Sequence, residues 1–379
     1  MKKLLIVGVS SKIGGIETFF LNLFKDKSQI FEVSFLSFDK ECAFSDIYLS
    51  NGYKVYVLPS RKKNPIMFAK NVKKFLKGHK EFDYIWINTS STSIYHFQYY
   101  GKKYTSAKII THSHGIKFEK TSGNLLYIIN KVLACINYQK VIKNTDLFFA
   151  CSHKAGIALY GKNKKNNIIV VRNGIETDKF KYSDEKRKLI REELGINSET
   201  LVLGMVGRLS KVKNPIKGIN IFKSILNINK NAVLLLVGDG ELKEDILSYI
   251  NLIGLQNKIF CLGIRHDIFN IMSAIDIILM PSLFEGLPLT AIEGQTAGCV
   301  CLLSDTITEE VKITNLVEFI SIDDEDSSWV EIISEKLKYI DVKSRVNYMD
   351  MVKNAKYDMR DSVKYIEDLL GGVGRNDKL

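Results

Sequence analysis

Short apolar runs rich in β-branched residues alternate along the chain with longer stretches in which apolar positions recur every three or four residues. The first pattern predicts buried strands and the second predicts amphipathic helices. Continuous apolar strands separated by helices are typical of an α/β protein with parallel sheets. In the first half the predicted strands are Lys3–Val9, Glu32–Ser37, Lys54–Leu58, Tyr84–Asn88, Lys108–Thr111, Leu147–Cys151 and Ile168–Val171.

The same alternation begins again in the second half of the chain. Its predicted strands are Leu201–Val206, Val233–Val237, Lys258–Leu262, Ile277–Met280 and Cys299–Leu303. A chain of 379 residues is longer than one hydrophobic core usually organises, so we expect two domains. The turn dipeptide Asn173-Gly174 and the charged stretch after it mark the boundary. We predict one domain over 1–178, a second over 179–360, and a tail over 361–379 that packs back on the first.

Composition narrows the class of protein. No stretch approaches the roughly 20 apolar residues of a membrane span, and the apolar run after Met1 lacks a small-residue cleavage site. The six cysteines form no CxxC pair and no zinc spacing, which favours reduced thiols, a cytoplasmic protein and no metal site. A net charge of +12 suits nucleic acid, an anionic membrane or a phosphate-rich substrate.

The segment from Met280 to Glu293 carries the strongest candidate chemistry. It follows a predicted strand, and Pro288 suits the first turn of a helix, which places Glu285 in the preceding loop and Glu293 within the helix. A helix start attracts anions and a carboxylate can hold a ribose diol. The alternative is a solvated loop and helix face. The candidate ligand-binding residues here are Gly286, Leu287, Pro288, Leu289 and Glu293. If Glu293 holds a ribose of a nucleotide-sugar donor, Glu285 faces the hydroxyls of its sugar.

Positive charge follows the first strand of the second half. Arg208 and Lys213 come directly after Leu201–Val206, at the carboxyl edge where open α/β sheets bind ligands. Fixed cations there stabilise a departing diphosphate; the alternative is a solvated basic loop. Gly238 and Ile264 follow the next two strands and are weaker donor-binding candidates.

Two further groups end strands of the first half. Gly14, Gly15 and Glu17 open a helix after Lys3–Val9 without forming the full GxGxxG pattern, so a nicotinamide or flavin is not predicted. His112 and His114 follow the strand Lys108–Thr111, where a histidine accepts a proton or bonds a sugar hydroxyl. The alternative is a structural histidine pair.

Taken in chain order, these motifs resemble the family-four retaining glycosyltransferases of the GT-B fold. The set comprises Gly14-Gly15, His112-Ser113-His114, Asn173-Gly174, Gly207-Arg208, Lys213-Asn214, Gly238-Asp239-Gly240, and Glu285 with Glu293 eight positions later (293 − 285 = 8). The resemblance covers nearly the whole chain and is greatest to bacterial enzymes that build capsular polysaccharide or exopolysaccharide. One departure is Gly294, where alanine is commoner in this family. Glycine in place of alanine lowers the stability of a helix by up to about 1 kcal/mol.

The resemblance implies two Rossmann-like domains with parallel sheets facing across a cleft, and a nucleoside-diphosphate sugar, most commonly a UDP-sugar, as donor. It implies that Arg208 and Lys213 bind the pyrophosphate, Glu293 the ribose and Glu285 the transferred sugar, without a metal or other cofactor. His114 then contacts the donor sugar beside Gly15, whereas Gly14, Glu17 and His112 lie on the acceptor side. Retention is expected through same-face attack, with double displacement through Glu285 as the alternative.

The acceptor side also carries a basic helix. Lys70, Lys73, Lys74 and Lys77 share one helical face, which predicts contact with an anionic membrane on the inner face of the plasma membrane and a lipid-linked saccharide acceptor. The alternative is a solvated lysine face.

A nucleotide-sugar epimerase of the same fold is the competing enzyme class. Nucleic-acid binding is not predicted, because no aromatic platform, helix-turn-helix or basic tail accompanies the charge.

Overall fold

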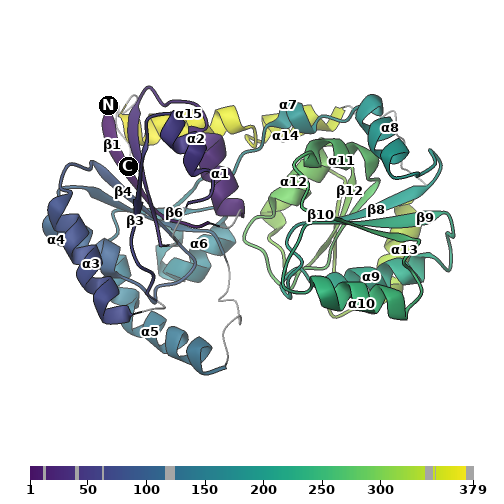
Figure 1. Cartoon of the computed structure of the whole chain (residues 1–379), viewed down its shortest axis with the longest axis horizontal. Coiled ribbons are helices and arrows are strands. Elements are labelled where there is room, and N and C mark those ends of the chain that lie inside the picture. Colours follow the sequence, from purple (N-terminus) through teal and green to yellow (C-terminus); the bar gives the residue numbers. More distant parts are fainter. Residues whose placement is uncertain are drawn as a thin grey trace. The chain divides into compact units, whose positions relative to one another are not determined.

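The computed structural model describes residues 1–11, 14–38, 42–61, 64–115, 124–337, 345 and 347–372. These residues form two compact units, one from Met1–Gly174 together with the segment after Met359, and one from Ile175–Asp358 (Figure 1). Residues 373–379 of the predicted tail lie outside the described residues. Each unit is built on its own parallel sheet, which confirms the predicted α/β class.

The first unit holds a seven-stranded sheet in the order β3-β2-β1-β4-β5-β6-β7, and every pairing is parallel. The apolar runs predicted as strands are all strands here. Their bounds are β1 (Lys2–Val9), β2 (Phe31–Ser37), β3 (Lys54–Val57), β4 (Tyr84–Thr89), β5 (Lys108–Ser113), β6 (Leu147–Ala150) and β7 (Ile168–Val170).

Helices cover both faces of this sheet. Leu4 and Ile6 of β1 pack with α1 and α15, whereas Leu5 and Val7 pack with α3 and α4, so successive residues of one strand enter two different cores. This burial on both faces explains the continuous apolar run. The helices of the unit are α1 (Gly15–Phe24), α2 (Ser45–Ser50), α3 (Pro65–Gly78), α4 (His96–Tyr104), α5 (Asn124–Lys143), α6 (His153–Tyr160), the 3₁₀ helix η1 (Lys162–Asn167) and α15 (Met359–Gly371).

The last helix belongs to the first unit although it follows the second in sequence. Met359, Ile366 and Leu370 of α15 join the core that contains α1. The Tyr84 hydroxyl donates a hydrogen bond to the Leu370 carbonyl at 2.9 Å, and Ser362 donates to the Arg172 carbonyl at 3.0 Å. The chain therefore returns to its starting unit through both apolar packing and specific hydrogen bonds.

The second unit holds a six-stranded parallel sheet in the order β10-β9-β8-β11-β12-β13. Val317–Ile320 is a strand that the sequence analysis missed: it is short, it lies at the sheet edge, and the polar Glu318 interrupts its apolar run. The strands are β8 (Leu201–Val206), β9 (Ala232–Val237), β10 (Ile259–Gly263), β11 (Ile277–Met280), β12 (Val300–Ser304) and β13 (Val317–Ile320).

Helices of the second unit pack on this sheet around a core that includes Phe222 and Trp329, both fully buried. Among the described residues, no helix of either unit is both long enough and apolar enough to cross a membrane. The helices of the second unit are α7 (Thr177–Phe180), α8 (Asp184–Glu193), α9 (Pro215–Ile225), α10 (Lys243–Leu252), α11 (Ile268–Ala274), α12 (Leu289–Thr296), η2 (Glu309–Val311), α13 (Asp326–Leu337) and α14 (Tyr348–Asn354).

Candidate functional site

The sheet of the second unit reverses its strand order at β8. From β8 the chain adds β9 and β10 on one side, and then crosses over to add β11, β12 and β13 on the other. Loops that leave the carboxyl ends of β8 and β11 therefore diverge at this point, which is where open parallel sheets bind ligands. Arg208 and Lys213 follow β8 and Glu285 follows β11, so the strand order brings these three predicted residues to one place.

The loops after β8 and β9 touch backbone to backbone. A Cβ atom at Gly238, where φ is +134°, would lie 2.0 Å from the carbonyl oxygen of Gly207. Next to this contact the Leu209 N–H donates to the Asp239 carbonyl at 3.0 Å. Only glycine fits at position 238. Its observed role is to hold the loop that carries Arg208, while the donor contact predicted for Gly238 stays a prediction.

Lys213 and Glu285 form an ion pair across the two loops. The Lys213 ammonium lies 2.5 Å from Oε1 of Glu285, and their side chains are 25% and 15% exposed. The two loops are also joined through backbone, because the Leu283 N–H donates to the Val212 carbonyl at 2.8 Å. Partial burial strengthens the attraction between the two charges. The pair is therefore a fixed feature of this edge.

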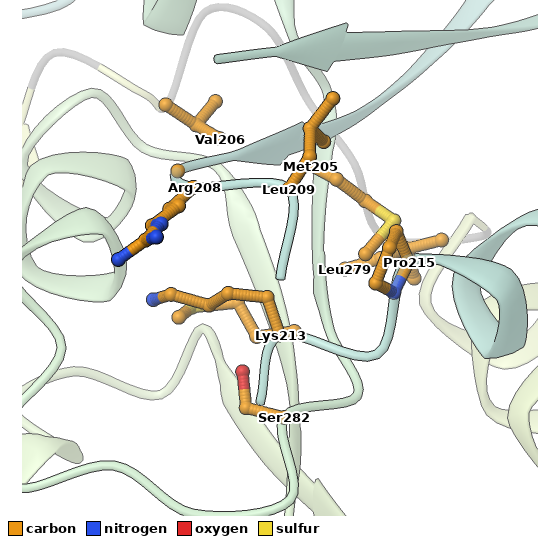
Figure 2. A pocket seen from close by; sticks show the side chains of 10 residues that line it. Met205, Val206, Arg208, Leu209, Lys213, Pro215, Leu279 and Ser282 are labelled. Carbon is orange, nitrogen blue, oxygen red and sulfur yellow. The ribbon is translucent and has the colours of Figure 1, made fainter. Parts of the chain in front are cut away.

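Arg208 reaches the same edge with a more exposed side chain. Its guanidinium lies 3.1 Å from Oε2 of Glu241, and both side chains are more than 40% exposed. Figure 2 shows the nitrogen tips of Arg208 and Lys213 extending to the same side of the pocket. An exposed ion pair contributes at most about 1 kcal/mol, so Arg208 can leave Glu241 at little cost. Two cations thus lie together, each held by a carboxylate.

Glu293 lies on α12 near the same lysine. Burial raises the pKa of its carboxyl to about 7, and the positive charge of Lys213 acts in the opposite direction. The carboxyl is therefore close to half ionised at neutral pH. A group in this state responds strongly to a ligand, because a hydrogen-bond donor brought to it favours the carboxylate.

The helix that carries Glu293 begins one residue later than predicted. Pro288 is the N-cap, with φ −75° and ψ 110°, and the helix starts at Leu289. Gly286, Leu287 and Pro288 are buried, whereas Leu289 is partly exposed. The Ala291 N–H donates to the Pro288 carbonyl at 3.2 Å. The amides that precede it at a helix start have no acceptor within the helix. The donor contacts predicted for these four residues stay predictions.

A cavity of about 20 Å³ lies directly behind the two cations. It is large enough for about one water molecule and too small for a sugar. Ser282 lines it, and its buried hydroxyl has no protein partner. In Figure 2 this hydroxyl points toward the side chain of Lys213. The other lining residues are Met205, Val206, Gly207, Arg208, Leu209, Lys213, Pro215, Leu279 and Met280.

Ile264 lies on the loop after β10. Its side chain is 68% exposed, so it is open to a ligand. The next residue, Arg265, is fixed by Glu193 at 2.5 Å and by Asp267 at 2.7 Å. These ion pairs anchor the loop around an exposed apolar side chain. No contact in the structure selects a base for this position, so its role stays a prediction.

In the first unit, His114 follows β5 and is held by Asn88. The His114 Nε2 and the Asn88 Oδ1 are 2.8 Å apart, and the Asn88 amide donates to the Val7 carbonyl at 3.0 Å. This second bond orients the amide, so Nε2 carries the proton and Nδ1 is the acceptor. Burial lowers the pKa of His114 to about 3, which keeps the imidazole neutral at physiological pH.

His112, which is predicted to lie on the acceptor side, has a fully buried side chain in this structure. Its Nδ1 accepts a hydrogen bond from the Trp86 Nε1 at 3.1 Å, and its ring packs edge-on against Phe19 and Phe149. Burial lowers its pKa well below the usual value. His112 therefore packs against His114, whose ring centroid lies 3.9 Å away. Its contact with an acceptor stays a prediction.

The loop between β1 and α1 is closed by Glu17. Its Oε1 accepts hydrogen bonds from the Ser10 N–H at 2.9 Å and the Ser10 hydroxyl at 2.8 Å, and its side chain is buried. A Cβ at Gly14 would lie 3.1 Å from the Glu17 carboxylate, whereas nothing lies within 4 Å at Gly15. Glu17 thus shapes the loop, and Gly15 leaves space beside it. Ligand contacts of Gly14, Gly15 and Glu17 stay predictions.

Sequence reasoning missed Asn88, Glu241 and Ser282. Asn88 ends the strand next to the one that carries the histidines, and its register partner is His112, so strand order would have pointed to it. Glu241 directly follows the turn Gly238-Asp239-Gly240, and only the contact between the loops after β8 and β9 brings it to Arg208. Ser282 gave no signal, because a buried serine is common in loops of this kind.

The described parts of the chain contain no cluster of side chains that could form a metal site. There, no group of three or more His, Cys, Asp or Glu side chains lies close enough to hold a metal ion. The described charges at the strand edge pair with each other, as Lys213 does with Glu285.

The chain is similar to known proteins. Residues 186–347 match the family model described as glycosyl transferases group 1. The chain is 28% identical over 341 residues to the putative glycosyltransferase EpsF of Bacillus subtilis, covering 88% of this chain and 87% of that protein. It is 26% identical over 346 residues to the UDP-Gal:alpha-D-GlcNAc-diphosphoundecaprenol alpha-1,3-galactosyltransferase of Escherichia coli, covering 82% and 86%. Neither relative is an epimerase, so that alternative gains no support.

A solved structure has the same fold over almost the whole chain. HepE of Anabaena, determined in complex with UDP-glucose, superposes with a TM-score of 0.80 at 19% identity and covers 98% of this chain and all of its own. At that identity the likeness concerns the fold. Two Rossmann-like halves with parallel sheets, as in the GT-B fold, are therefore confirmed.

Proposed function

We propose, from the premise that residues 186–347 are a glycosyl transferases group 1 domain, that this chain transfers a sugar from a UDP-sugar to a saccharide carried on a lipid diphosphate. The observation that carries the proposal is the pair of cations at the strand switch point, with Lys213 bound to Glu285 and Arg208 bound to Glu241. A diphosphate is the ligand that two such cations neutralise best.

The donor would replace the two carboxylates that hold the cations. The Arg208 fork and the Lys213 ammonium would bind the pyrophosphate, and the start of α12 would add backbone N–H groups. Glu285, released from Lys213, would accept hydrogen bonds from hydroxyls of the transferred sugar. Glu293 would hold the ribose diol as a carboxylate, with its pKa falling below 7 in the complex. Ile264 would pack against the base.

Catalysis would depend on stabilising the leaving group. As the bond between the anomeric carbon and the diphosphate oxygen breaks, negative charge grows on that oxygen, and Arg208 and Lys213 neutralise it. The acceptor hydroxyl oxygen bonds to the anomeric carbon from the same face, and its proton passes to the departing phosphate. The products are UDP and the extended saccharide, with the anomeric configuration retained.

Metal independence is part of the proposal. Arg208 and Lys213 supply the two positive charges that Mg²⁺ provides in other diphosphate sites. His114 would bind a donor-sugar hydroxyl through Nδ1, because Asn88 occupies its Nε2 proton. A neutral imidazole with a pKa of about 3 is suited to accept a hydrogen bond, and it remains neutral across the working range of pH.

The acceptor is proposed from the chemistry of the relatives. The Escherichia coli relative is named for a sugar linked to diphosphoundecaprenol, and such a lipid keeps its saccharide at a membrane surface. We place the chain at the inner face of the plasma membrane, where exopolysaccharide units are assembled. Lys70, Lys73, Lys74 and Lys77 are all exposed on α3 and would contact anionic headgroups.

A calorimetric titration with a panel of nucleotide sugars tests the proposal. UDP-glucose, UDP-galactose, UDP-N-acetylglucosamine and GDP-mannose are each titrated in the presence of EDTA. We expect a UDP-sugar to bind without added metal, and the proton NMR spectrum of the transfer product to show the anomeric configuration of the donor. Binding of none of the four would overturn the donor assignment, and an inverted product would overturn retention.

A further inference from the structure

Helix α5 has its apolar side outward. Ile128, Ile129, Val132 and Ile136 are 55%, 42%, 52% and 61% exposed. Their spacing of one, four and eight positions from Ile128 places them on one face of the helix. These four residues are named the α5 stripe. A helix on the surface of a water-soluble protein normally turns such a face to the core.

The opposite side of α5 is anchored through polar groups. The amide of Asn137, which is buried, donates to the Ser93 carbonyl at 3.1 Å, and Thr92 donates to the Ala134 carbonyl at 2.8 Å. Asn130 accepts from the Arg61 guanidinium at 3.4 Å. These polar residues, with Val141 and Ile142 near the end of the helix, hold α5 to the unit while the α5 stripe faces outward. The orientation is fixed by specific hydrogen bonds.

Tyrosine and lysine side chains contact each other on and between α3, α4 and α5. Helices α3, α4 and α5 lie side by side along one side of the first unit (Figure 1). The Lys140 ammonium lies 4.4 Å from the ring centroid of Tyr95, and the Lys77 ammonium lies 5.0 Å from that of Tyr104. Tyrosine and lysine together are typical of the boundary between water and lipid, since both combine an apolar body with a polar tip.

The charge of these three helices has one sign. Their sequences contain no Asp or Glu. One of the lysines, Lys102, is paired with Asp146 at 2.5 Å. The others are exposed, and they are Lys70, Lys73, Lys74 and Lys77 on α3, Lys103 on α4, and Lys131, Lys140 and Lys143 on α5. A surface of this composition attracts an anionic partner.

We infer that the α5 stripe inserts into the headgroup boundary of an anionic lipid bilayer, with the tyrosines of α4 and the lysines of α3 to α5 around it. An apolar helix face flanked by lysines lies in the plane of such a boundary, its affinity set by buried apolar area and by attraction to anionic lipid. Each exposed lysine near the surface adds up to about fivefold in affinity. A second protein chain would gain the apolar contact but would bury lysines without acidic partners.

The inference deepens the proposed function, on which its purpose rests, because insertion would keep the first unit at the surface that holds a lipid-linked acceptor. It adds an apolar, inserted element to the lysine contact already proposed. Binding to vesicles is measured without donor, acceptor or turnover, so a failure of the inference is distinguishable from a failure of the proposed function.

Vesicle sedimentation of the full chain tests the inference. The probe is large vesicles of phosphatidylcholine with about 30% phosphatidylglycerol, compared with phosphatidylcholine alone. The variant Ile128→Ser/Ile136→Ser removes half of the α5 stripe, and we expect its partition coefficient to fall at least about tenfold. The matched control is Leu49→Ser/Leu252→Ser, which changes residues 56% and 82% exposed elsewhere, and should bind as the unchanged protein does.

Three results would overturn the inference. The first is that the unchanged protein does not bind the anionic vesicles. The second is that Ile128→Ser/Ile136→Ser binds as well as the control, which would mean that lysines alone make the contact. In the third, light scattering would show a dimer that the same substitutions dissociate while vesicle binding is unaffected, so that the α5 stripe would join two copies. Circular dichroism and thermal unfolding of each variant verify that the first unit, which carries Ile128 and Ile136, is folded.

Discussion

Lys213 and Glu285 form an ion pair at 2.5 Å although 72 positions separate them (285 − 213 = 72). The strand order explains their meeting, because β8 and β11 are neighbours and each residue leaves the carboxyl end of one of them. The ion pair holds a cation and a carboxylate, both partly buried, at the place where we propose that the donor binds. A donor that separates them gives the lysine a phosphate and the glutamate a sugar hydroxyl.

Replacing Lys213 with methionine removes the ammonium while keeping most of the side-chain volume. We expect turnover to fall at least about 100-fold, because the diphosphate leaving group loses one of two cations. The pKa of Glu293 should also rise above about 7, since Lys213 lowers it. The matched control is Lys211→Met, an exposed lysine of the same loop. Equal turnover of the two variants would contradict the role given to Lys213.

Glu293→Gln should make the ligand-free protein more stable at alkaline pH. The pKa of Glu293 is about 7 when folded against 4.5 ordinarily, so between these values the folded state binds more protons. The stability this contributes is complete below pH 4.5 and is lost as pH rises through 7. The variant should thus gain up to about 3 kcal/mol over the unchanged protein at pH 8 and nothing at pH 4.

Urea denaturation at the two pH values measures this difference, and calorimetry with UDP measures its cost in binding. If the ribose is held by the Glu293 carboxylate, the variant binds UDP more weakly while it unfolds less readily at pH 8. A gain in stability of the same size at pH 4 and pH 8 would show that ionisation of Glu293 is not its cause.

Asn88→Ala should lower turnover through His114. Without the Asn88 Oδ1, the Nε2 proton of His114 loses its partner and the acceptor at Nδ1 is no longer fixed. We expect a roughly tenfold loss in kcat, with UDP affinity within about twofold, because the cations that bind UDP lie in the other unit. Residues that act together are not additive. Adding His114→Ala to Asn88→Ala should therefore cost less than the product of the two single effects.

Gly238→Ala should disrupt the contact between the loops after β8 and β9 by steric conflict. The added methyl would lie 2.0 Å from the Gly207 carbonyl at a φ of +134°. We expect a loss of at least about 3 kcal/mol in the free energy of unfolding. Gly254→Ala is the matched control, since Gly254 also has a positive φ, +71°, but nothing lies within 4 Å; it should lose only about 1 kcal/mol. Equal losses would mean that backbone conformation alone requires glycine at 238.

The sequence predicts strands well where both faces of the sheet are covered. Leu201–Val206 and Ile277–Met280 have the same bounds in prediction and structure, because every residue of a doubly covered strand is apolar or small. Val317–Ile320 was missed because an edge strand tolerates Glu318. The other edge strands β3, β7 and β10 were predicted, so the polar residue within a run of four, and not the edge position alone, hid this strand.

From the sequence, the candidate site can be predicted only for residues that directly follow a predicted strand. Arg208 and Lys213 follow a strand visibly, but their carboxylate partners depend on which strands are neighbours, and one sequence does not give that order. His112 and His114 look equivalent in sequence. Only the structure reveals that Trp86 donates to one while the other keeps an acceptor nitrogen available.

The central claim is that Arg208 and Lys213 bind a diphosphate, and calorimetric titration of UDP against uridine tests it most directly. The unchanged protein should bind UDP, and Arg208→Ala/Lys213→Ala should bind it at least about 100-fold more weakly. Uridine, which has no phosphate, should bind both proteins alike. Equal affinity of the two proteins for UDP would contradict the account.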